Sequence, residues 1–355
     1  MNVLSLFDGM SCGQQALERS GIKIDKYFAS EIDKYAIKVT MANYPNTIQL
    51  GSVVNVDGYS LPKIDLLIGG SPCQSFSFAG KRKGMSTKDE QEILTLEHYL
   101  QLKADDYEFE GQSYLFWEYM RLLNECKPTY FLLENVMMGE KWENVLSKAI
   151  GVKPIMINSA LVSAQNRQRL YWTNIGMKPS GFFGDLESII EQPKDKEILL
   201  KDILETDVDE KYFISEKMIA GFERHKERHN NKGTGFNWKP TDGDKKANFL
   251  RANAALNATD NSIIVHSTMS RSSTNGNGGS GHLSKEGDKS YCLDTANSMA
   301  VENNQRIRRL TPIECERLQT VADNYTNHVS DSQRYKMLGN GWTVDVIAHI
   351  FSYLP

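Results

Sequence analysis

Cys73 stands directly after an apolar stretch of the sequence, in a position where loops carry chemistry more often than packing. It belongs to the segment IGGSPCQSFSFAGKRKG (68–84), and Pro72 stiffens the approach to it. A loop thiol acts as a nucleophile when its pKa is lowered or when a base assists it. A semi-buried structural cysteine is the alternative interpretation. That alternative suits the other four cysteines better, because three fall in helical patterns and one in a loop-rich region: Cys12, Cys126, Cys315 and Cys292.

A carboxylate follows the same pattern in a later apolar stretch. Glu134 closes the run TYFLLENV (129–136), with Asn135 beside it. A carboxyl group at the rim of a sheet, partly shielded from water, is suited to protonating or hydrogen-bonding a heterocyclic base. A helix-capping or salt-bridged carboxylate is the alternative.

Two arginines alternate in the run QNRQRLYW. On a strand, Arg167 and Arg169 would point the same way, while Gln168 points away. Two guanidinium groups that converge on one point indicate an anionic or carbonyl-rich substrate. Ordinary surface charge is the alternative.

A glycine turn near the N-terminus has the features of a nucleoside site. The run FDGMSCG (7–13) follows the first apolar stretch, and Glu31 comes about 20 residues later, where a carboxylate can accept hydrogen bonds from ribose hydroxyls. The glycine spacing is G-x-x-x-G rather than G-x-G-x-x-G, so a pyrophosphate cradle is not indicated. A nucleoside cofactor without phosphates, such as S-adenosylmethionine, fits better. A tight turn with a solvated glutamate is the alternative.

The alternation of predicted strands and helices indicates a parallel or mostly parallel sheet with helices on both faces. Ligands of such sheets bind at the carboxyl ends of the strands. Asp8, Glu31, Cys73 and Glu134 all fall at such ends. The predicted strands are 2–7, 25–31, 63–70, 129–136 and 169–176, and the predicted helices are 12–21, 32–44 and 113–128.

Two further helices are predicted near the C-terminus. Thr311 has the properties of an N-cap, with Pro312 at the first helical position and Glu314 at the third. The run MLGNGWTVDVIAHIFSYL (337–354) predicts a glycine turn that opens an apolar helix.

Composition is ordinary for a soluble globular protein, with 355 residues, 40% hydrophobic and 24% charged. No run approaches the roughly 18 apolar residues of a membrane helix, and the N-terminus lacks a signal-peptide pattern, so we expect a cytoplasmic location. Five cysteines without CxxC spacing indicate neither a disulfide framework nor a metal site. The net charge of −4 does not indicate nucleic-acid binding, and the basic clusters are weak evidence alone: 81–83, 224–228 and 306–309.

The composition and the periodicity of the sequence change after about residue 178. Residues 221–305 are rich in Asn, Gly, Ser and Lys and show little periodicity. We therefore expect a catalytic domain at 1–177, completed by 330–355, and a small loop-rich domain at 178–329.

Taken together, these motifs resemble those of the DNA (cytosine-5-)-methyltransferase family, of the prokaryotic or phage modification type. The resemblance covers nearly all of the catalytic part. It runs through FDGMSCG, GGSPCQSFSFAG, LLENV, QNRQR, RRLTPIECERLQ and GNGWTV in the family's order. It implies a Rossmann-like class I S-adenosylmethionine-dependent methyltransferase domain, with a smaller target-recognition domain that reads double-stranded DNA in the major groove.

The resemblance also implies roles for the polar residues. Cys73 would add to C6 of a flipped-out cytosine, and Glu134 would bind N3 and the exocyclic amine. Arg169 would hold O2 of the base, and Arg167 would support the loop or a neighbouring phosphate. The run SFSFAGKRKG (75–84) would be the mobile loop that closes over DNA.

The cofactor implied by the resemblance is S-adenosylmethionine. Its methionine part, its ribose and its adenine would be surrounded in turn by side chains from the strand ends and from the C-terminal turn. These cofactor residues would be Phe7, Gly9, Met10, Cys12, Glu31, Ile32, Ser52, Val53, Pro72 and Asn340.

The chain departs from the family pattern at three places. Ser52 stands where the family usually has the aspartate that binds the adenine amino group, and it is a weaker acceptor. The family's GNS is GNG here, followed by Trp342, which we expect near the pocket. An acidic insertion with helix-like periodicity, 85–111, follows the loop and could shield the open site or bind a partner.

Three other functions remain open from the sequence. An RNA substrate is one, although the Cys-Phe-Thr signature of the tRNA-methylating branch is absent. A catalytically dead DNA-binding regulator is the second, and intact Cys73, Glu134 and Arg169 argue against it. A small-molecule methyltransferase is the third, but it leaves three of the motifs unexplained. We expect the protein to be a monomer.

Overall fold

A mostly parallel sheet forms the centre of the protein. The computed structural model describes residues 1–72, 85–88, 91–109, 111–180, 185–231, 240–241, 243–248, 250, 262–265 and 306–355. Among these, the largest sheet has seven strands in the order β3-β2-β1-β4-β5-β8-β6. The first five run parallel, and β8 is antiparallel to both β5 and β6. The bounds are β1 (Asn2–Leu6), β2 (Lys26–Ser30), β3 (Ile48–Gln49), β4 (Leu66–Gly70), β5 (Tyr130–Val136), β6 (Ile155–Asn158) and β8 (Gln168–Thr173).

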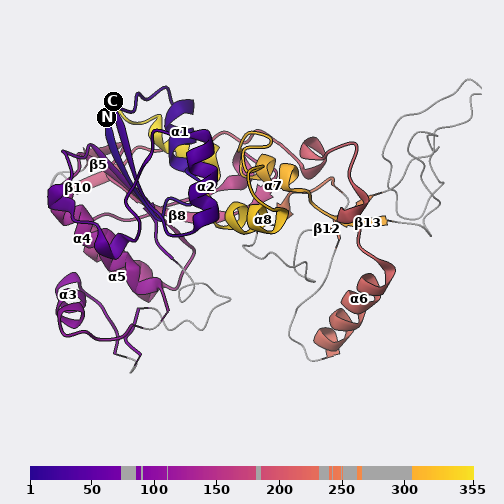
Figure 1. Cartoon of the computed structure of the whole chain (residues 1–355), viewed down its shortest axis with the longest axis horizontal. Coiled ribbons are helices and arrows are strands. Elements are labelled where there is room, and N and C mark those ends of the chain that lie inside the picture. The colour runs from indigo at the N-terminus through magenta and orange to yellow at the C-terminus, as the bar shows by residue number, and fades with distance from the viewer. Residues whose placement is uncertain are drawn as a thin grey trace, which may run out of the picture.

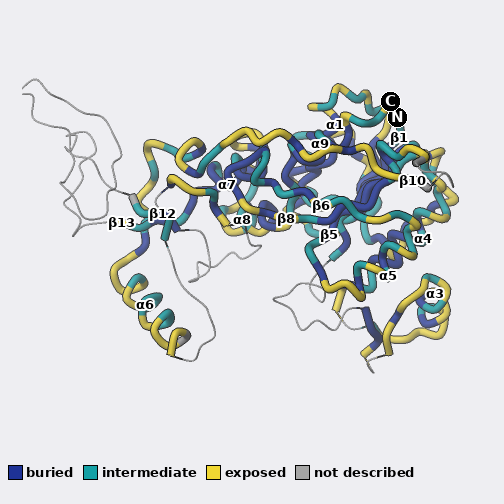
Figure 2. The backbone as a smooth tube through the Cα atoms, turned by 180° about the vertical axis from the view of Figure 1, so that it is seen from behind, coloured by how far each residue is buried: buried dark blue, intermediate teal, exposed yellow. Residues whose placement is uncertain are grey.

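Alternating residues of the strands feed two hydrophobic cores, one on each face of the sheet. In β4, Leu66 and Ile68 belong to one core and Leu67 belongs to the other, as the period-two geometry of a strand requires. Strands that are apolar on both faces are typical of parallel sheets covered by helices on both sides. Figure 2 draws the central strands as buried. The predicted mostly parallel sheet between helical layers is therefore confirmed.

The helices divide between these two cores. Leu17 of α1, Val39 of α2 and Ile347 of α9 pack in the first core, whereas Leu122 of α4 and Leu146 of α5 pack in the second. The chain therefore returns at its C-terminus to the face that its first helix covers, and Figure 1 draws the two termini next to each other. The bounds are α1 (Cys12–Arg19), α2 (Lys34–Asn43), α4 (Phe116–Cys126), α5 (Glu140–Ile150) and α9 (Val344–Phe351).

The described part of the acidic insertion packs on the outer side of α4. It contains α3 (Leu96–Ala104), which confirms the helix-like periodicity. Tyr99 and Leu102 of α3 are buried in the second core. The Glu118 carboxylate of α4, which is completely buried, accepts hydrogen bonds from the Tyr99 hydroxyl and the Lys103 ammonium. The insertion is therefore part of the folded body.

A second group, made of the sheet of β12 (Ser262–Val265) and β13 (Arg306–Arg309) and one long helix, lies beyond the central sheet, whereas β10 (Asp185–Ser188) lies at the end that holds the central sheet (Figure 1). The prediction that the region from 221 contains little regular structure is wrong at its start, because α6 (Glu216–Asn231) is a helix of 16 residues. Its sequence is mostly charged and polar, and its large apolar residues lie only in its first half, so its apolar period is short. The remaining strands are β7 (Gln165–Asn166), β9 (Met177–Ser180) and β11 (Ala247–Asn248).

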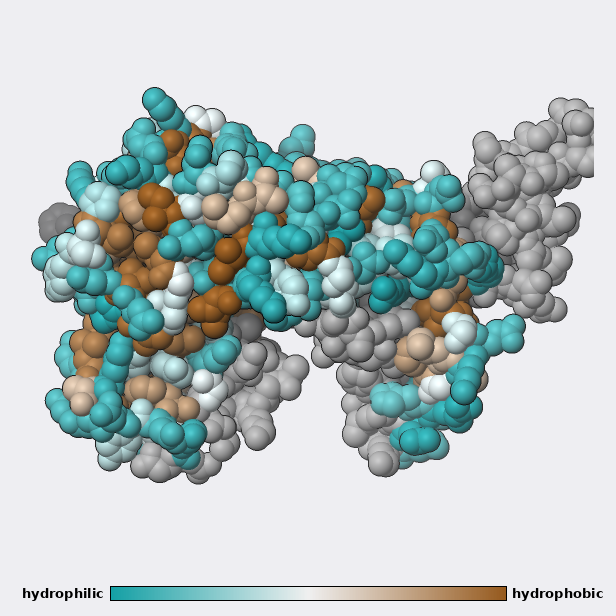
Figure 3. All heavy atoms as spheres, in the orientation of Figure 1, coloured by the Kyte–Doolittle hydropathy of each residue, from teal (hydrophilic) through white to brown (hydrophobic). Residues whose placement is uncertain are grey.

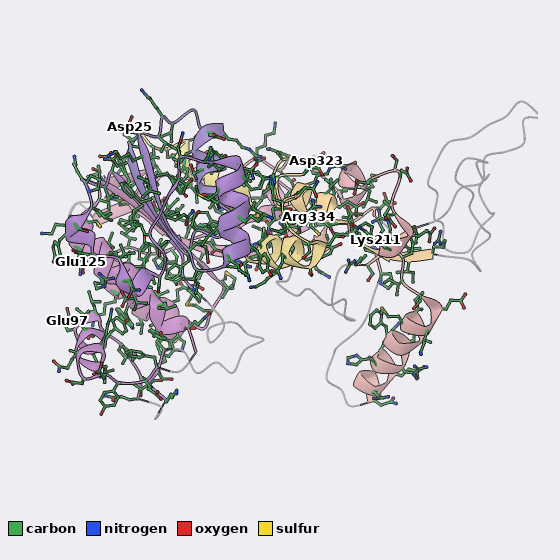
Figure 4. The ribbon with its side chains drawn as sticks, in the orientation of Figure 1. Asp25, Glu97, Glu125, Lys211, Asp323 and Arg334 are labelled. Atoms are coloured by element: carbon green, nitrogen blue, oxygen red, sulfur yellow. The ribbon has the colours of Figure 1, made fainter. Side chains whose placement is uncertain are left out.

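Two helices connect this second group to the central sheet. Helix α7 (Pro312–Leu318) begins with the predicted capping box, in which Thr311 and Glu314 bond to each other's backbone N–H groups. Helix α8 (Asp331–Asn340) was not predicted, and it includes Gly339 and Asn340 of the expected glycine turn. Arg334 of α8, labelled in Figure 4, pairs with the buried Glu316 of α7 at 3.1 Å. The proposed domain boundary at residue 329 stays a prediction.

The surface also differs between the two ends of the molecule. On the face drawn in Figure 3, hydrophobic side chains gather over the end that holds the central sheet, while the other end is mainly hydrophilic. No helix within the described residues combines the length and the apolar character needed to cross a membrane.

Candidate active site

The glycine turn after β1 has an unusual backbone. Phe7, Gly9 and Ser11 all have φ in the left-handed region, at 58°, 58° and 63°. Such values cost little for glycine but are uncommon for a bulky residue such as Phe7. A Cβ placed on Gly9 would meet no atom within 4 Å. The turn therefore leaves open space above Gly9, at the carboxyl edge of the sheet.

Glu31 fixes this turn from the end of β2. Its Oε2 accepts the Gly9 N–H at 2.7 Å, and its Oε1 accepts the N–H groups of Ile32 and Asp33 at 2.7 and 2.8 Å. Ile32 beside it is 71% exposed, although it is a large aliphatic residue. A carboxylate between an open glycine turn and an exposed aliphatic side chain fits the ribose and the flat base of a nucleoside.

The inner wall of the turn is made of buried residues. Met10 and Cys12 are almost completely buried, and the Tyr325 hydroxyl donates a hydrogen bond to the Met10 carbonyl at 2.7 Å. Burial raises the pKa of the Cys12 thiol to about 12. Cys12 therefore stays a neutral thiol and forms part of the apolar wall. This agrees with the interpretation of Cys12 as a structural cysteine in the sequence analysis.

Asp8 is a partly buried acid within the same turn. It accepts hydrogen bonds from the Tyr27 hydroxyl and the Ser11 hydroxyl, both at 2.7 Å. Burial raises the pKa of Asp8 to about 6, against the opposing effect of these donors. Asp8 was noticed in the sequence only as a polar residue at a strand end, and nothing there signalled its burial.

The other predicted cofactor residues are spread around the carboxyl edge. Pro72 is partly buried after β4, and Asn340 is exposed at the end of α8. Ser52 precedes a short 3-10 helix and makes no capping hydrogen bond with its side chain. Val53 is buried in the second core, and its carbonyl accepts from Arg121. The structure brings Phe7, Gly9 and Glu31 together in one turn, and the cofactor roles of all these residues stay predictions.

Glu134 lies beside the end of β4, where it is paired across the sheet with Gly70. Its Oε1 forms an ion pair with Arg169 Nε at 2.9 Å, and its Oε2 accepts a hydrogen bond from the Trp342 indole N–H at 3.2 Å. The side chains of Glu134 and Arg169 are 11% and 13% exposed. An ion pair is one of the alternatives that the sequence left open for Glu134, and it forms here with the other predicted substrate-binding residue.

Cys73 and the loop 75–84 lie outside the described residues. The chain directly before Cys73 is fixed, because the Asn135 amide donates to the Ser71 hydroxyl at 3.0 Å. Asn135 is the neighbour of Glu134 in the chain. The strand that carries Glu134 therefore also holds Ser71, two residues before Cys73.

Arg167 has a different environment from Arg169. Its side chain is buried, and its guanidinium donates to the carbonyls of Gly341 at 3.0 Å, Gly339 at 3.3 Å and Leu250 at 3.5 Å. The two guanidinium groups therefore have different partners, and their convergence on one point stays a prediction. Arg167 lies in the break between β7 and β8, so the alternation of one continuous strand does not apply to it.

A buried polar cluster that the sequence did not indicate holds the C-terminal turn. Gln319 donates to the carbonyls of Leu338 and Gly341, and its own carbonyl oxygen accepts from Gln165 and from the Thr343 hydroxyl. Buried polar groups that satisfy one another in this way hold a backbone in one conformation. The cluster therefore fixes residues 339–343, which carry Asn340 and Trp342.

The described residues contain no group of three or more His, Cys, Asp or Glu side chains arranged to hold a metal ion. The polar groups at the carboxyl edge are instead the backbone N–H groups of the glycine turn, the Glu31 carboxylate beside the open space, and the ion pair of Glu134 and Arg169. This set suits a nucleoside and a heterocyclic base.

Comparison with known proteins decides the family. A family model described as C-5 cytosine-specific DNA methylase matches residues 1–354. The chain belongs to this family. It is therefore an enzyme of DNA cytosine methylation, as the order of its motifs predicted.

Curated relatives of this methylase come from bacteria and phages. The type II methyltransferase M.HpaII of Haemophilus parainfluenzae is 28% identical, over 97% of this chain and 86% of the relative. The orphan methyltransferase M.SPRI of Bacillus phage SPR is 27% identical, over 100% of this chain and 97% of the relative. The type II methyltransferase M1.ScrFI of Lactococcus lactis subsp. cremoris is 28% identical, over 92% of this chain and 70% of the relative.

Solved structures support the fold of the methylase. The Entamoeba histolytica methyltransferase EhMeth matches with a TM-score of 0.65 and 17% identity, over 100% of this chain and 97% of the other. A mutant of Spodoptera frugiperda DNMT2 matches with a TM-score of 0.61 and 20% identity, over 99% of both chains. With the strand order described above, these matches confirm the predicted class I methyltransferase fold.

Proposed function

We propose that this methylase transfers a methyl group from S-adenosylmethionine to C5 of a flipped-out cytosine in a specific double-stranded DNA sequence. The observation that carries the proposal is the paired Glu134 and Arg169 at the carboxyl edge of the sheet, next to the turn that leads into Cys73. A carboxylate and a guanidinium side by side match the edge of cytosine, which offers a ring nitrogen, an amine and a carbonyl.

The cofactor would occupy the open space at the glycine turn. The open position at Gly9 and the exposed Ile32 on either side of Glu31 support this placement. Glu31 would accept the ribose hydroxyls, and Ile32 would pack on the adenine. When bound, S-adenosylmethionine supplies an electrophilic methyl group on a sulfonium.

Cys73 would make C5 of cytosine reactive. C5 of the free base is a poor nucleophile, and addition of the Cys73 thiolate at C6 converts the ring into an enamine that is nucleophilic at C5. Glu134 would hold N3 and the exocyclic amine, and Arg169 would hold O2, as charge develops on the ring. After C5 has taken the methyl group, a base removes the C5 proton and the C6–sulfur bond breaks, which restores the thiolate.

Arg167 would act through the C-terminal turn. It donates to the carbonyls of Gly339 and Gly341 on either side of Asn340. These hydrogen bonds support a role in which Arg167 holds the protein backbone. Nothing in the described residues supports the other expected role, a contact with a DNA phosphate.

The target base must leave the duplex, because thiol addition at C6 needs access to a ring edge that stacking and pairing hide. We propose that residues 178–329 read the target sequence and that the protein acts as a monomer on DNA, in a bacterial or phage modification system. The names of the curated relatives support the modification role.

The test is methyl transfer from labelled S-adenosylmethionine to unmethylated plasmid DNA, with total RNA in parallel and Cys73→Ala as the control. We expect label on DNA, none on RNA and none with Cys73→Ala. Bisulfite sequencing of the plasmid should then show one recurring cytosine context. Label on RNA alone, or label on DNA that survives Cys73→Ala, would contradict the proposal.

A further inference from the structure

Trp342 contacts the proposed catalytic carboxylate directly. Its indole N–H donates to Glu134 Oε2 at 3.2 Å, while Arg169 Nε binds the other oxygen, Oε1, at 2.9 Å. An ion pair on one oxygen and a hydrogen bond on the other together restrict the rotation of the carboxylate about its last bond more than either contact alone. The acceptor of the indole N–H is a charged group, which strengthens a hydrogen bond.

Gly70 provides the space that this contact needs. It is the register partner of Glu134, and a Cβ built on it would lie 2.9 Å from Trp342 Nε1 and 3.0 Å from Glu134 Oε2. Gly70 lies within β4 and has no left-handed φ, so its backbone conformation does not require glycine. A side chain there would be wedged between the two groups.

The backbone of Trp342 is held independently of Glu134. The carbonyl of the preceding Gly341 accepts from Arg167 and Gln319, and the hydroxyl of the following Thr343 donates to Gln319. Gly341 also lies against the cofactor turn, since a Cβ built on it would come within 3.0 Å of Met10 Cε. Trp342 therefore reaches from a rigid turn beside the cofactor pocket to the carboxylate.

We propose that Trp342 is a positioning residue that holds the Glu134 carboxylate in the orientation that meets the edge of the cytosine, with Gly70 as the space through which it reaches. The proposal rests on the function of Glu134 proposed above. Without the indole N–H, the carboxylate keeps Arg169 but can rotate, and misplacement of a binding group by about 1 Å can slow a reaction about a hundredfold.

The kinetic test compares Trp342→Phe with Trp172→Phe in the full chain. Trp172 also donates its indole N–H, to the Ser147 hydroxyl at 2.9 Å, on the far side of the sheet in the second core, so its replacement is a matched loss of one such bond. We expect Trp342→Phe to lower the single-turnover rate of methyl transfer about tenfold or more. The dissociation constant of S-adenosylmethionine should change less than about threefold, and Trp172→Phe should leave the rate unchanged.

Gly70→Ala provides a second, independent variant, because it keeps both partners and separates them. It should lower the same rate without weakening cofactor binding. Rates equal to wild type in both Trp342→Phe and Gly70→Ala would overturn the proposal. So would a loss of rate that only follows a loss of cofactor affinity, since Trp342 would then merely line the cofactor pocket.

A spectroscopic measurement separates this proposal from the proposed function. In a spectrum of ¹⁵N-labelled indole N–H groups, the resonance lost in Trp342→Phe identifies Trp342. We expect Glu134→Gln to shift that resonance, and an unmoved resonance would overturn the positioning contact. If the resonance shifts but the wild-type protein methylates no DNA, the contact stands and the proposed function fails.

Discussion

At the residue scale, the site depends on side chains held in unusual environments. Asp8 is partly buried in the cofactor turn, between the hydroxyls of Tyr27 and Ser11. Burial raises the pKa of Asp8 to about 6 from an ordinary value of 3.8. Folding therefore favours the protonated form of Asp8 over the ionised form. The stability of the folded protein should then fall as Asp8 ionises.

Asp8→Asn tests this effect. Because the native pKa lies above the unfolded one, the stabilisation from protonated Asp8 is complete below about pH 4 and is lost as the pH rises to about 6. The free energy of unfolding of Asp8→Asn, relative to wild type, should therefore rise by about 2 kcal/mol between pH 4 and pH 7. Urea unfolding at several pH values measures the difference, and a difference independent of pH would refute the burial of this acid.

At the element scale, strands and helices with an apolar pattern or a capping box can be predicted from the sequence. Elements that depend on contacts with distant polar residues cannot. The strands β1, β2, β4, β5 and β8 and the start of α7 were predicted because apolar runs and a capping box are local signals, whereas β3 and β6 of the same sheet were not predicted. Helix α8 was missed because one of its buried positions is the charged Arg334, held by Glu316 of α7, and its buried apolar residues lie only at its C-terminal end. Helix α6 was missed because its large apolar residues lie only in its first half. Distant partners of this kind cannot be read from a single segment.

The acidic insertion gives an element-scale prediction. Glu118→Ala removes the acceptor that joins Tyr99 and Lys103 of α3 to α4 and leaves charges nearby without their partner. We expect the free energy of unfolding to fall by about 3 kcal/mol. Glu97→Ala is the control, because Glu97, labelled in Figure 4, is an exposed carboxylate of the same helix α3. Equal stability of the two variants, measured by urea unfolding, would show that the insertion is not anchored there.

At the scale of the whole molecule, the C-terminal part completes a site that the N-terminal strands begin. The Tyr325 hydroxyl reaches the carbonyl of Met10, and the Trp342 indole reaches Glu134. The motif residues Glu31, Glu134 and Arg169 could be identified from the sequence because their types and positions are characteristic. The supports Gln165, Gln319 and Tyr325 could not, since a buried glutamine or tyrosine carries no signal until its partner is known.

Tyr325→Phe tests this closure. Loss of the hydroxyl leaves the Met10 carbonyl without this donor and loosens the cofactor turn, so the dissociation constant of S-adenosylmethionine should rise about five- to tenfold. Tyr335→Phe is the matched control, because its hydroxyl makes an equivalent bond to the carbonyl of Leu310, outside the glycine turn. Titration calorimetry should show weakened binding for Tyr325→Phe alone, and equal effects of both variants would refute a specific contribution of Tyr325.

The most direct test of the central claim is to trap the intermediate on Cys73. A duplex with the target sequence and 5-fluorocytosine at the target position is incubated with the enzyme and S-adenosylmethionine. Because fluorine at C5 cannot leave as a proton does, the C6–sulfur bond should persist. Mass spectrometry should then find the nucleotide on the peptide that contains Cys73, and none on Cys73→Ala. An enzyme that methylates cytosine in the ordinary duplex but forms no such complex, or that forms it at another residue, would contradict the account.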